Sequence, residues 1–159
     1  MPIHARRSPS RGLTLIELLV AIVIMGILLA VAMPGMRSLV VGQQLKTASF
    51  ELTADLILAR SEALKRNRSV NVTREGGDWK LGWTVGVTGG DAVNKRGVAG
   101  SDIVFENAPG SITFDANGRV SAPTDPVRIT VKSNEASGNS RCIELDLSGR
   151  AKATRGACA

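Results

Sequence analysis

The apolar residues in the first part of this chain follow two successive helical patterns. From Leu18 to Met36 there are 19 residues without a charge, close to the ~20 apolar residues with which a helix crosses a bilayer core. Beyond Pro34 the pattern becomes one-sided, because apolar residues recur at three- and four-residue steps to about Lys65. The members of this stripe are Leu45, Ala48, Leu52, Leu56, Ala59 and Ala63. Together the two patterns predict one long N-terminal helix with a membrane-spanning first half and an amphipathic second half.

The rest of the chain alternates short apolar runs with turn residues, which is typical of β-strands. We expect about six strands, at 69–73, 78–87, 103–105, 111–114, 127–131 and 142–147. Residues 86–102 carry five glycines and no apolar periodicity, so we expect a long mobile loop there with Lys95 and Arg96 at its centre. Both tryptophans, Trp79 and Trp83, are expected in the core. The predicted fold class is α+β, a long helix packed on short antiparallel β-sheets.

Length and composition limit the chemistry of this domain. Of the 159 residues, about 100 remain beyond the helix, enough for one small domain. The only histidine is His4, and the sequence lacks phosphate-cradling, metal-binding and redox motifs, so we expect no active site. Cys142 and Cys158 lack the spacing of zinc ligands, and in an exported domain an even cysteine count indicates a disulfide. Two free thiols are the alternative.

Charged residues at the start of the apolar run indicate its orientation in the membrane and what kind of segment it is. Arg6, Arg7 and Arg11 precede it, which places its N-terminal end in the cytoplasm. Glu17 lies near its start, where a carboxylate without a partner costs several kcal/mol. Two alternatives give Glu17 no function: the run could be a secretory signal cleaved at the small residues 30–32, or a plain signal anchor. The carboxylate argues against the first, because it falls inside the apolar region of such a signal.

The stretch Arg11-Gly12-Leu13-Thr14-Leu15-Ile16-Glu17, followed by the apolar helix, resembles the class III signal of type IV pilins and type II secretion pseudopilins. The resemblance implies that a prepilin peptidase cuts after Gly12 and methylates the new N-terminus at Leu13, where the family usually has phenylalanine. It also implies that Glu17, the fifth mature residue, pairs with that amine on a neighbouring subunit.

The resemblance divides the chain into three parts. Residues 1–12 are the expected leader, 13–36 the transmembrane and assembly half of the helix, and 37–159 a periplasmic globular domain that includes the amphipathic half. The formal charge of +6 falls to +3 when the three arginines of the leader are removed. At 55–67 the end of the helix looks like that of the GspH/FimT family. The resemblance is therefore to this branch of the pilin-like proteins.

The segment after the last expected strand is the one concentrated basic element. It carries Arg150, Lys152 and Arg155, with no acid after Asp146. In FimT proteins of competent bacteria a Gly-Arg-x-Arg motif near the closing cysteine binds DNA, and the segment 149–152, Gly-Arg-Ala-Lys, resembles it with lysine in the last place. Lysine keeps the charge but not the fork of donors. The resemblance implies a DNA-binding tail, for which a solvated polar tail is the alternative.

We therefore expect a minor type IV pilin of the FimT kind, held in the inner membrane with its domain in the periplasm before it enters a pilus. The expected partners are double-stranded DNA taken up during natural transformation, other pilins met through the N-terminal helix, and the prepilin peptidase. No cofactor or metal is expected, and the chain is not expected to be an enzyme. The alternative is a GspH-like minor pseudopilin, a structural component at the tip of a type II secretion system.

Overall fold

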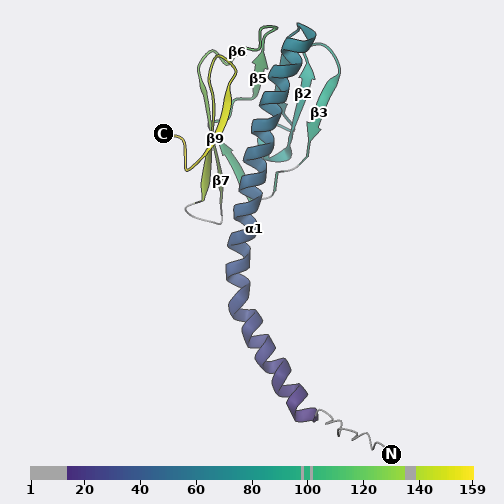
Figure 1. Cartoon of the computed structure of the whole chain (residues 1–159), viewed down its shortest axis with the longest axis vertical. Coiled ribbons are helices and arrows are strands. Elements are labelled where there is room, and N and C mark those ends of the chain that lie inside the picture. The colour runs from purple at the N-terminus through teal and green to yellow at the C-terminus, as the bar shows by residue number, and fades with distance from the viewer. Residues whose placement is uncertain (1–13, 98, 101, 135–138) are drawn as a thin grey trace, which may run out of the picture. The chain divides into compact units, whose positions relative to one another are not determined.

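The computed structural model describes residues 14–97, 99–100, 102–134 and 139–159. Within these ranges the chain forms one long helix, one short 3-10 helix and nine strands (Figure 1). Two compact units, Met1–Arg37 and Ser38–Ala159, divide the chain. The expected leader and the expected cleavage site, Gly12 and Leu13, lie outside the described residues.

The long helix, α1, covers Leu15–Arg66 and is capped at both ends. Thr14 and Glu17 form a capping box, in which the Glu17 N–H donates to Thr14 Oγ1 at 3.3 Å and the Thr14 N–H donates to Glu17 Oε2 at 3.0 Å. At the other end Asn67 adopts a φ of 50°, and the Arg68 N–H reaches the Ala63 carbonyl at 3.3 Å. This is a Schellman arrangement, and it confirms the helix end predicted near Lys65.

In the first unit the described side chains of α1 are exposed; Leu15, for example, is 82% exposed. Among the helical residues that the structure describes, no stretch qualifies by length and apolar character as a membrane span. The transmembrane half expected at 13–36 therefore stays a prediction.

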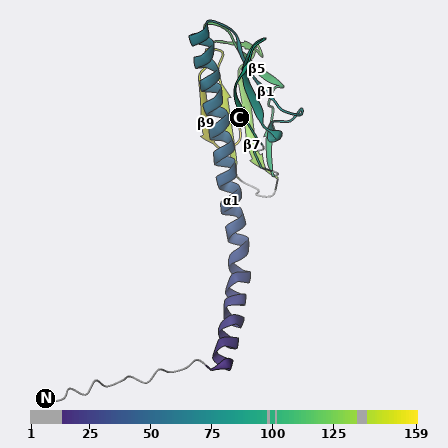
Figure 2. The same cartoon turned by 90° about the vertical axis from the view of Figure 1, so that its right-hand side faces the viewer.

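In the second unit the predicted apolar stripe of α1 lies in the core. All six of its residues are buried, none more than 2% exposed. They pack with buried residues of the strands, among them Val72, Ile112, Ile129 and Ile143. Both views show the C-terminal part of α1 running alongside the strands (Figures 1 and 2). The three- and four-residue spacing thus predicted correctly which face of the helix the sheets cover.

The strands form two antiparallel sheets within this unit. The first has the order β3-β2-β1-β5-β6, with β1 Val70–Arg74, β2 Trp83–Val87, β3 Ala92–Arg96, β5 Ser111–Phe114 and β6 Val120–Ala122. The second has the order β4-β7-β8-β9, with β4 Ile103–Glu106, β7 Val127–Ser133, β8 Ser140–Leu145 and β9 Ala151–Arg155. The α+β class and the long helix on antiparallel sheets are confirmed.

The sequence prediction of about six strands missed three. β6 has only three residues, and β9 is almost wholly exposed, so neither carries a strong apolar alternation. The expected strand at 78–87 is interrupted, because Trp79–Leu81 forms the 3-10 helix η1 and only the rest is β2. Both tryptophans are nonetheless buried, at 2% and 1% exposure, as predicted.

The long mobile loop expected at 86–102 is wrong in its central part. Residues Ala92–Arg96 form β3, which pairs antiparallel with β2. The side chains of this strand are largely polar, so it shows no apolar alternation in the sequence. Two of them are polar because they bind a buried carboxylate of α1. Asp55, 2% exposed, accepts hydrogen bonds from Asn94 Nδ2 at 2.8 Å and Arg96 Nε at 2.9 Å.

Candidate nucleic-acid interface

The basic segment forms the exposed edge of the second sheet. β9 pairs with β8 alone, and Glu144 lies directly opposite Lys152 while Arg141 lies opposite Arg155. Arg150 occupies the turn that precedes β9. The tail expected from the sequence is thus a strand held in register by a neighbour, and its cations have fixed positions along an edge.

Arg150 extends from this turn into solvent, with its side chain 77% exposed. Its Nε donates to Asp146 Oδ2 at 3.1 Å, and its backbone N–H donates to Asp146 Oδ1 at 3.1 Å. The Ser148 hydroxyl and the Arg150 backbone N–H, in that order, lower the pKa of Asp146 to about 2. The aspartate is therefore ionised at neutral pH and offsets part of the charge that Arg150 presents.

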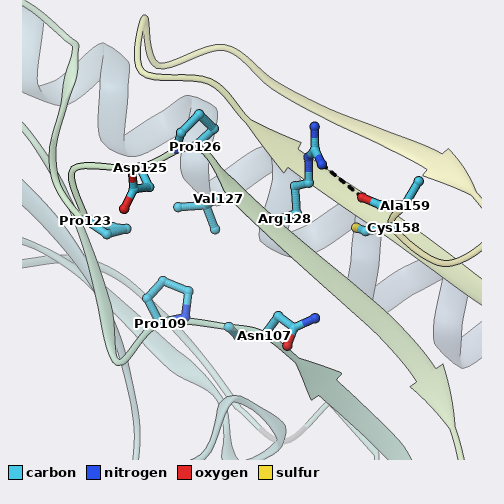
Figure 3. Close-up of a pocket in the computed structure, with 10 residues that line it drawn as sticks. Asn107, Pro109, Pro123, Asp125, Pro126, Val127, Arg128, Cys158 and Ala159 are labelled. Atoms are coloured by element: carbon cyan, nitrogen blue, oxygen red, sulfur yellow. Dashed lines mark hydrogen bonds between the residues drawn. The ribbon is translucent and has the colours of Figure 1, made fainter.

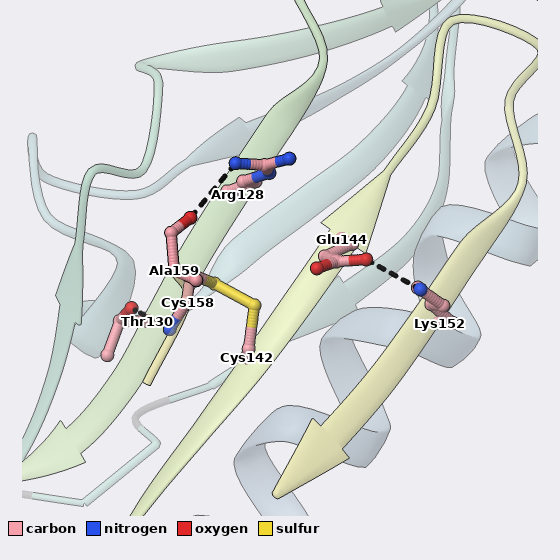
Figure 4. The surroundings of a disulfide bond; sticks show 7 residues. All are labelled: Arg128, Thr130, Cys142, Glu144, Lys152, Cys158 and Ala159. Carbon is pink, nitrogen blue, oxygen red and sulfur yellow. Dashed lines mark hydrogen bonds and ion pairs between the residues drawn. A yellow bond between two sulfur atoms is a disulfide. The ribbon is translucent and has the colours of Figure 1, made fainter. Parts of the chain in front are cut away.

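Lys152 is also exposed and also has an acidic partner. Its Nζ lies 2.7 Å from Glu144 Oε2, on the adjacent strand (Figure 4). Hydrogen bonding and the charge of Lys152 hold the pKa of Glu144 below its ordinary value. Glu144 precedes Asp146 in the chain, and only hairpin pairing brings it opposite the lysine.

The three predicted DNA-binding cations do not share one face. Successive side chains of a strand point to opposite faces, so Lys152 and Arg155 lie on opposite sides of β9. Lys152 shares a face with Cys142 and Glu144, whereas Arg155 shares the face of the buried Ile143. Only the strand edge is therefore common to both cations.

A disulfide joins Cys142 to Cys158, as the sequence indicated. Figure 4 shows it beside two further contacts that hold the same end of the chain. The Cys158 backbone N–H donates to Thr130 Oγ1 at 3.1 Å, and Arg128 Nη1 donates to the Ala159 carbonyl at 2.9 Å. The segment after β9 is therefore fastened to both β8 and β7.

The turn that carries Arg150 has a counterpart in the other sheet. The pattern Asp-x-x-Gly-Arg occurs at 115–119 and at 146–150. In each turn the aspartate side chain accepts the N–H of the arginine, and the aspartate carbonyl accepts the N–H of the glycine at 2.9 Å. The glycines, Gly118 and Gly149, adopt φ values of 70° and 80°. We call this pair the twin turns; the repeated pattern is visible in the sequence.

The twin turns contact each other directly. A Cβ on Gly149 would lie 2.2 Å from the Gly118 carbonyl oxygen and 3.2 Å from Arg60 Nε on α1. The Val120 N–H adds a hydrogen bond to the Leu147 carbonyl at 3.1 Å. Packing therefore requires a glycine at position 149, the first residue of the Gly-Arg-x-Lys segment. This contact also fixes the backbone position from which the Arg150 side chain extends.

Comparisons with known proteins agree with this architecture. A family model described as type II transport protein GspH matches residues 48–149, and one described as a prokaryotic N-terminal methylation motif matches residues 7–33. The chain belongs to the GspH family. No curated protein matches it at a significant level.

Two solved structures resemble this GspH-family chain, both of the type IV minor pilin FimU of Pseudomonas aeruginosa PAO1, in different crystal forms. Each is 27% identical in sequence. One has a TM-score of 0.61 and covers 70% of this chain and 89% of its own; the other has a TM-score of 0.58, with 69% and 92% covered. The fold is that of type IV pilins, and the chain is a pilin-like protein of the GspH/FimT kind.

The N-terminal motif of this pilin-like chain is present, but its chemistry falls largely outside the described residues. The methylation-motif match spans Gly12, Leu13 and Glu17. Glu17 is described, and its carboxylate accepts hydrogen bonds from the backbone and hydroxyl of Thr14 at 3.0 and 2.9 Å. The pairing of Glu17 with the Leu13 amine of a neighbour stays a prediction.

Lys95 and Arg96 lie in the first sheet and are engaged there. Lys95 Nζ lies 3.4 Å from Glu75 Oε2, and Arg96 binds the buried Asp55 and, at 3.9 Å, Glu51. These partners raise the pKa of Arg96, chiefly through the hydrogen bond to Asp55. The role of Arg96 is therefore structural, to satisfy a buried carboxylate of α1.

A pocket of about 700 Å³ lies beside the disulfide (Figure 3). Three prolines line it, and its charged lining residues, among those that the structure describes, are Asp125 and Arg128, the second of which is bonded to Ala159. The described lining includes no histidine, lysine, serine or free thiol that would pair with the aspartate in acid–base or nucleophilic chemistry. Within the described ranges, no group of histidine, cysteine and carboxylate side chains is arranged to hold a metal.

Proposed function

We propose that this minor pilin binds double-stranded DNA without strong sequence preference, through Arg150, Lys152 and Arg155 along the β9 edge, during DNA uptake. The observation that supports this most directly is the presentation of two long cationic side chains, 77% and 68% exposed, on a fixed strand edge. Phosphates lie at regular intervals along a duplex, so cations spaced along an edge suit them. An approach along the edge also brings Arg155, from the other face, within reach.

The acidic partners set the strength of this interaction. To bind DNA, Arg150 and Lys152 must give up their contacts with Asp146 and Glu144 and take phosphates instead. An exposed ion pair is worth ~0–1 kcal/mol, so this exchange is feasible, but it lowers the affinity for DNA. Three cations that release counterions give a log–log salt slope of about −2 to −3. The aromatic residues Trp79 and Trp83 are buried, so neither is available for stacking on bases. Affinity per subunit should be micromolar or weaker.

The N-terminal half completes the proposal. Cleavage after Gly12 and methylation of Leu13 would produce a mature chain whose helix anchors it in the inner membrane, with Ser38–Ala159 in the periplasm. Glu17 would then pair with the Leu13 amine of a neighbouring pilin during assembly, because a carboxylate in an apolar setting needs a partner. Replacing Glu17 by valine would keep the apolar length but remove that pair, and so impair assembly rather than insertion.

The test is DNA binding by the full-length chain in nonionic detergent, measured by fluorescence anisotropy as salt is raised. The double substitution Arg150→Ala with Lys152→Ala should reduce the magnitude of the salt slope by about two and weaken all duplex sequences alike. Lys132→Ala is the matched control, because Lys132 is a cation on the same sheet whose side chain is 42% exposed and pairs with Glu106 at 2.6 Å. Unchanged binding in the double variant would exclude the β9 edge as the site.

A second candidate is a minor pseudopilin of a type II secretion system. The description of the matching family model, a type II transport protein, favours it, and so does the pairing of both exposed cations with acids. In that case the unsubstituted chain would show no DNA binding at low salt. The neighbouring genes, if they encode secretion components rather than pilus components, would give the same answer independently.

A further inference from the structure

Two arginines face each other across the end of the β8–β9 hairpin. Arg141 and Arg155 are register partners, so their Cβ atoms lie about 5 Å apart on one face of the sheet. Like charges placed directly opposite each other destabilise a strand pair. Neither arginine has an acidic side chain within ion-pair distance in the part of the chain that the structure describes.

The same hairpin compensates its other charges. Lys152 lies opposite Glu144 and pairs with it, and Arg150 pairs with Asp146. The face of β8 and β9 that carries Arg141 and Arg155 offers Ile143 and Ala153 as the next pair, and Leu145 and Ala151 after them. No carboxylate of β8 or β9 follows along that face, so within this hairpin nothing balances the charge of the two arginines.

These arginines line a pocket. It has a volume of about 330 Å³, and Gly42 and Leu45 of α1 form its apolar wall. Asn139, Ser140 and Gly156 supply further polar groups. Among the described residues that line it, none is acidic. A guanidinium offers several N–H donors in a planar fork that fits the oxygens of a phosphate, and two arginines from neighbouring strands line this one concave site.

We propose that this pocket binds a phosphate group, held between the guanidinium groups of Arg141 and Arg155. The ligand chemistry is a phosphate monoester or diester of small size, since the site is bounded by the helix on one side. It is separate from the proposed contacts of Arg150 and Lys152 with DNA, because Lys152 lies on the other face of β9. Arg155 can serve the pocket whether or not the chain binds DNA.

Inorganic phosphate is the first probe, tested with the full-length chain in nonionic detergent against chloride at equal ionic strength. Phosphate should raise the midpoint of thermal unfolding and shift the side-chain Nε–Hε signals of Arg141 and Arg155. Arg155→Gln, which keeps length and polarity but loses the charge, should weaken phosphate affinity at least tenfold. Arg119→Gln is the control, because Arg119 is exposed and outside the pocket, and it should leave the affinity unchanged.

A charge reversal separates ligand binding from simple loss of stability. Arg155→Glu supplies a carboxylate opposite Arg141, so it should raise the unfolding midpoint in chloride above that of Arg155→Gln and abolish the response to phosphate. Equal phosphate responses in the unsubstituted chain and Arg155→Gln would overturn the proposal, as would a lower midpoint for Arg155→Glu than for Arg155→Gln. Glycerol phosphate and a thymidine dinucleotide, compared as ligands, distinguish a lipid headgroup from a nucleic-acid phosphate as the source.

Discussion

Asp55 Oδ2 lies 2.9 Å from Arg96 Nε, although 41 residues separate them in the chain. The carboxylate is buried on the core face of α1 and also accepts hydrogen bonds from Trp83 Nε1, at 2.9 Å, and from Asn94. A buried charge is tolerated only when it is paired and fully hydrogen-bonded. The first sheet is thus attached to the helix by a polar contact as well as by its apolar side chains.

Asp55→Ala should therefore destabilise the second unit strongly. The substitution leaves the buried Trp83 N–H without its acceptor, which costs ~1–3 kcal/mol, and it also removes the ion pair of Arg96, whose side chain is 38% exposed. Urea unfolding monitored by tryptophan fluorescence measures the loss. Glu51→Ala is the matched control, because Glu51 lies one turn earlier, is 35% exposed and reaches Arg96 only at 3.9 Å; it should change stability by less than ~1 kcal/mol.

Gly149→Ala should cost more than the left-handed conformation alone explains. A φ of 80° costs an alanine ~1–2 kcal/mol, and its Cβ would also meet the Gly118 carbonyl at 2.2 Å, which adds ~1–3 kcal/mol of overpacking. Gly156→Ala isolates the first effect, since Gly156 has a φ of 99° and no atom within 4 Å of its Cβ position. Equal losses in the two variants, measured by urea unfolding, would show that the twin turns give way to the added methyl group.

Reducing the disulfide should lower stability by ~3 kcal/mol in a chain-entropy estimate, because the bond closes a loop with a sequence separation of 16. Hydrogen exchange should show the loss mainly in β9 and the segment after it, which is the exposed part of the loop. Core strands such as β1 should keep their protection. Non-reducing mass analysis checks the starting state, and free thiols there would contradict the assignment.

Glu144→Gln should tighten DNA binding if the β9 edge is the site. Glu144 holds Lys152 at 2.7 Å, so neutralising it frees the lysine and removes a repulsive charge next to the phosphates. An exposed pair is worth ~0–1 kcal/mol, which corresponds to a gain of up to about fivefold in affinity. Glu106→Gln frees Lys132 in the same way and serves as the comparison. The proposed site would be in doubt if both variants gained equally.

Processing gives the last prediction. Mass spectrometry of the native protein should find a methylated N-terminus at Leu13, and Gly12→Ala should block cleavage, since the peptidase of this family cuts after the glycine. A mature start at Met33 would instead indicate an ordinary secretory signal.

Burial could be predicted from the sequence where apolar residues recur at the spacing of a helix. Leu45, Leu52 and Leu56 recur at helical spacing and are buried, so the core face of α1 could be predicted. Asp55 could not, because its place in the core depends on donors from β2 and β3, and nothing local distinguishes it from a solvated carboxylate. β3 escaped for the converse reason, since Asn94 and Arg96 are polar residues that serve a buried acid.

The candidate site was predicted in its residues but not in its geometry. Arg150, Lys152 and Arg155 were identified from a motif and from charge, both of which are properties of the linear chain. Pairing them with Asp146, Glu144 and Arg141 requires the register of β8 and β9. A hairpin drawn symmetrically about Ser148 places Glu144 opposite Lys152, so part of this information was present in the sequence.

If the chain enters a filament that pulls on bound DNA, as proposed, the disulfide-closed loop limits how far β9 can be extended. Force applied at Lys152 enters β9 between Cys142 and Cys158, which are joined. The hydrogen bonds of the β8–β9 hairpin can open under tension, but the loop bounds how far this segment extends, and the pull passes through the sulfur bridge into β8. β9 is in this respect part of a covalently closed ring, so it would separate from β8 less far under force than a strand with an open end.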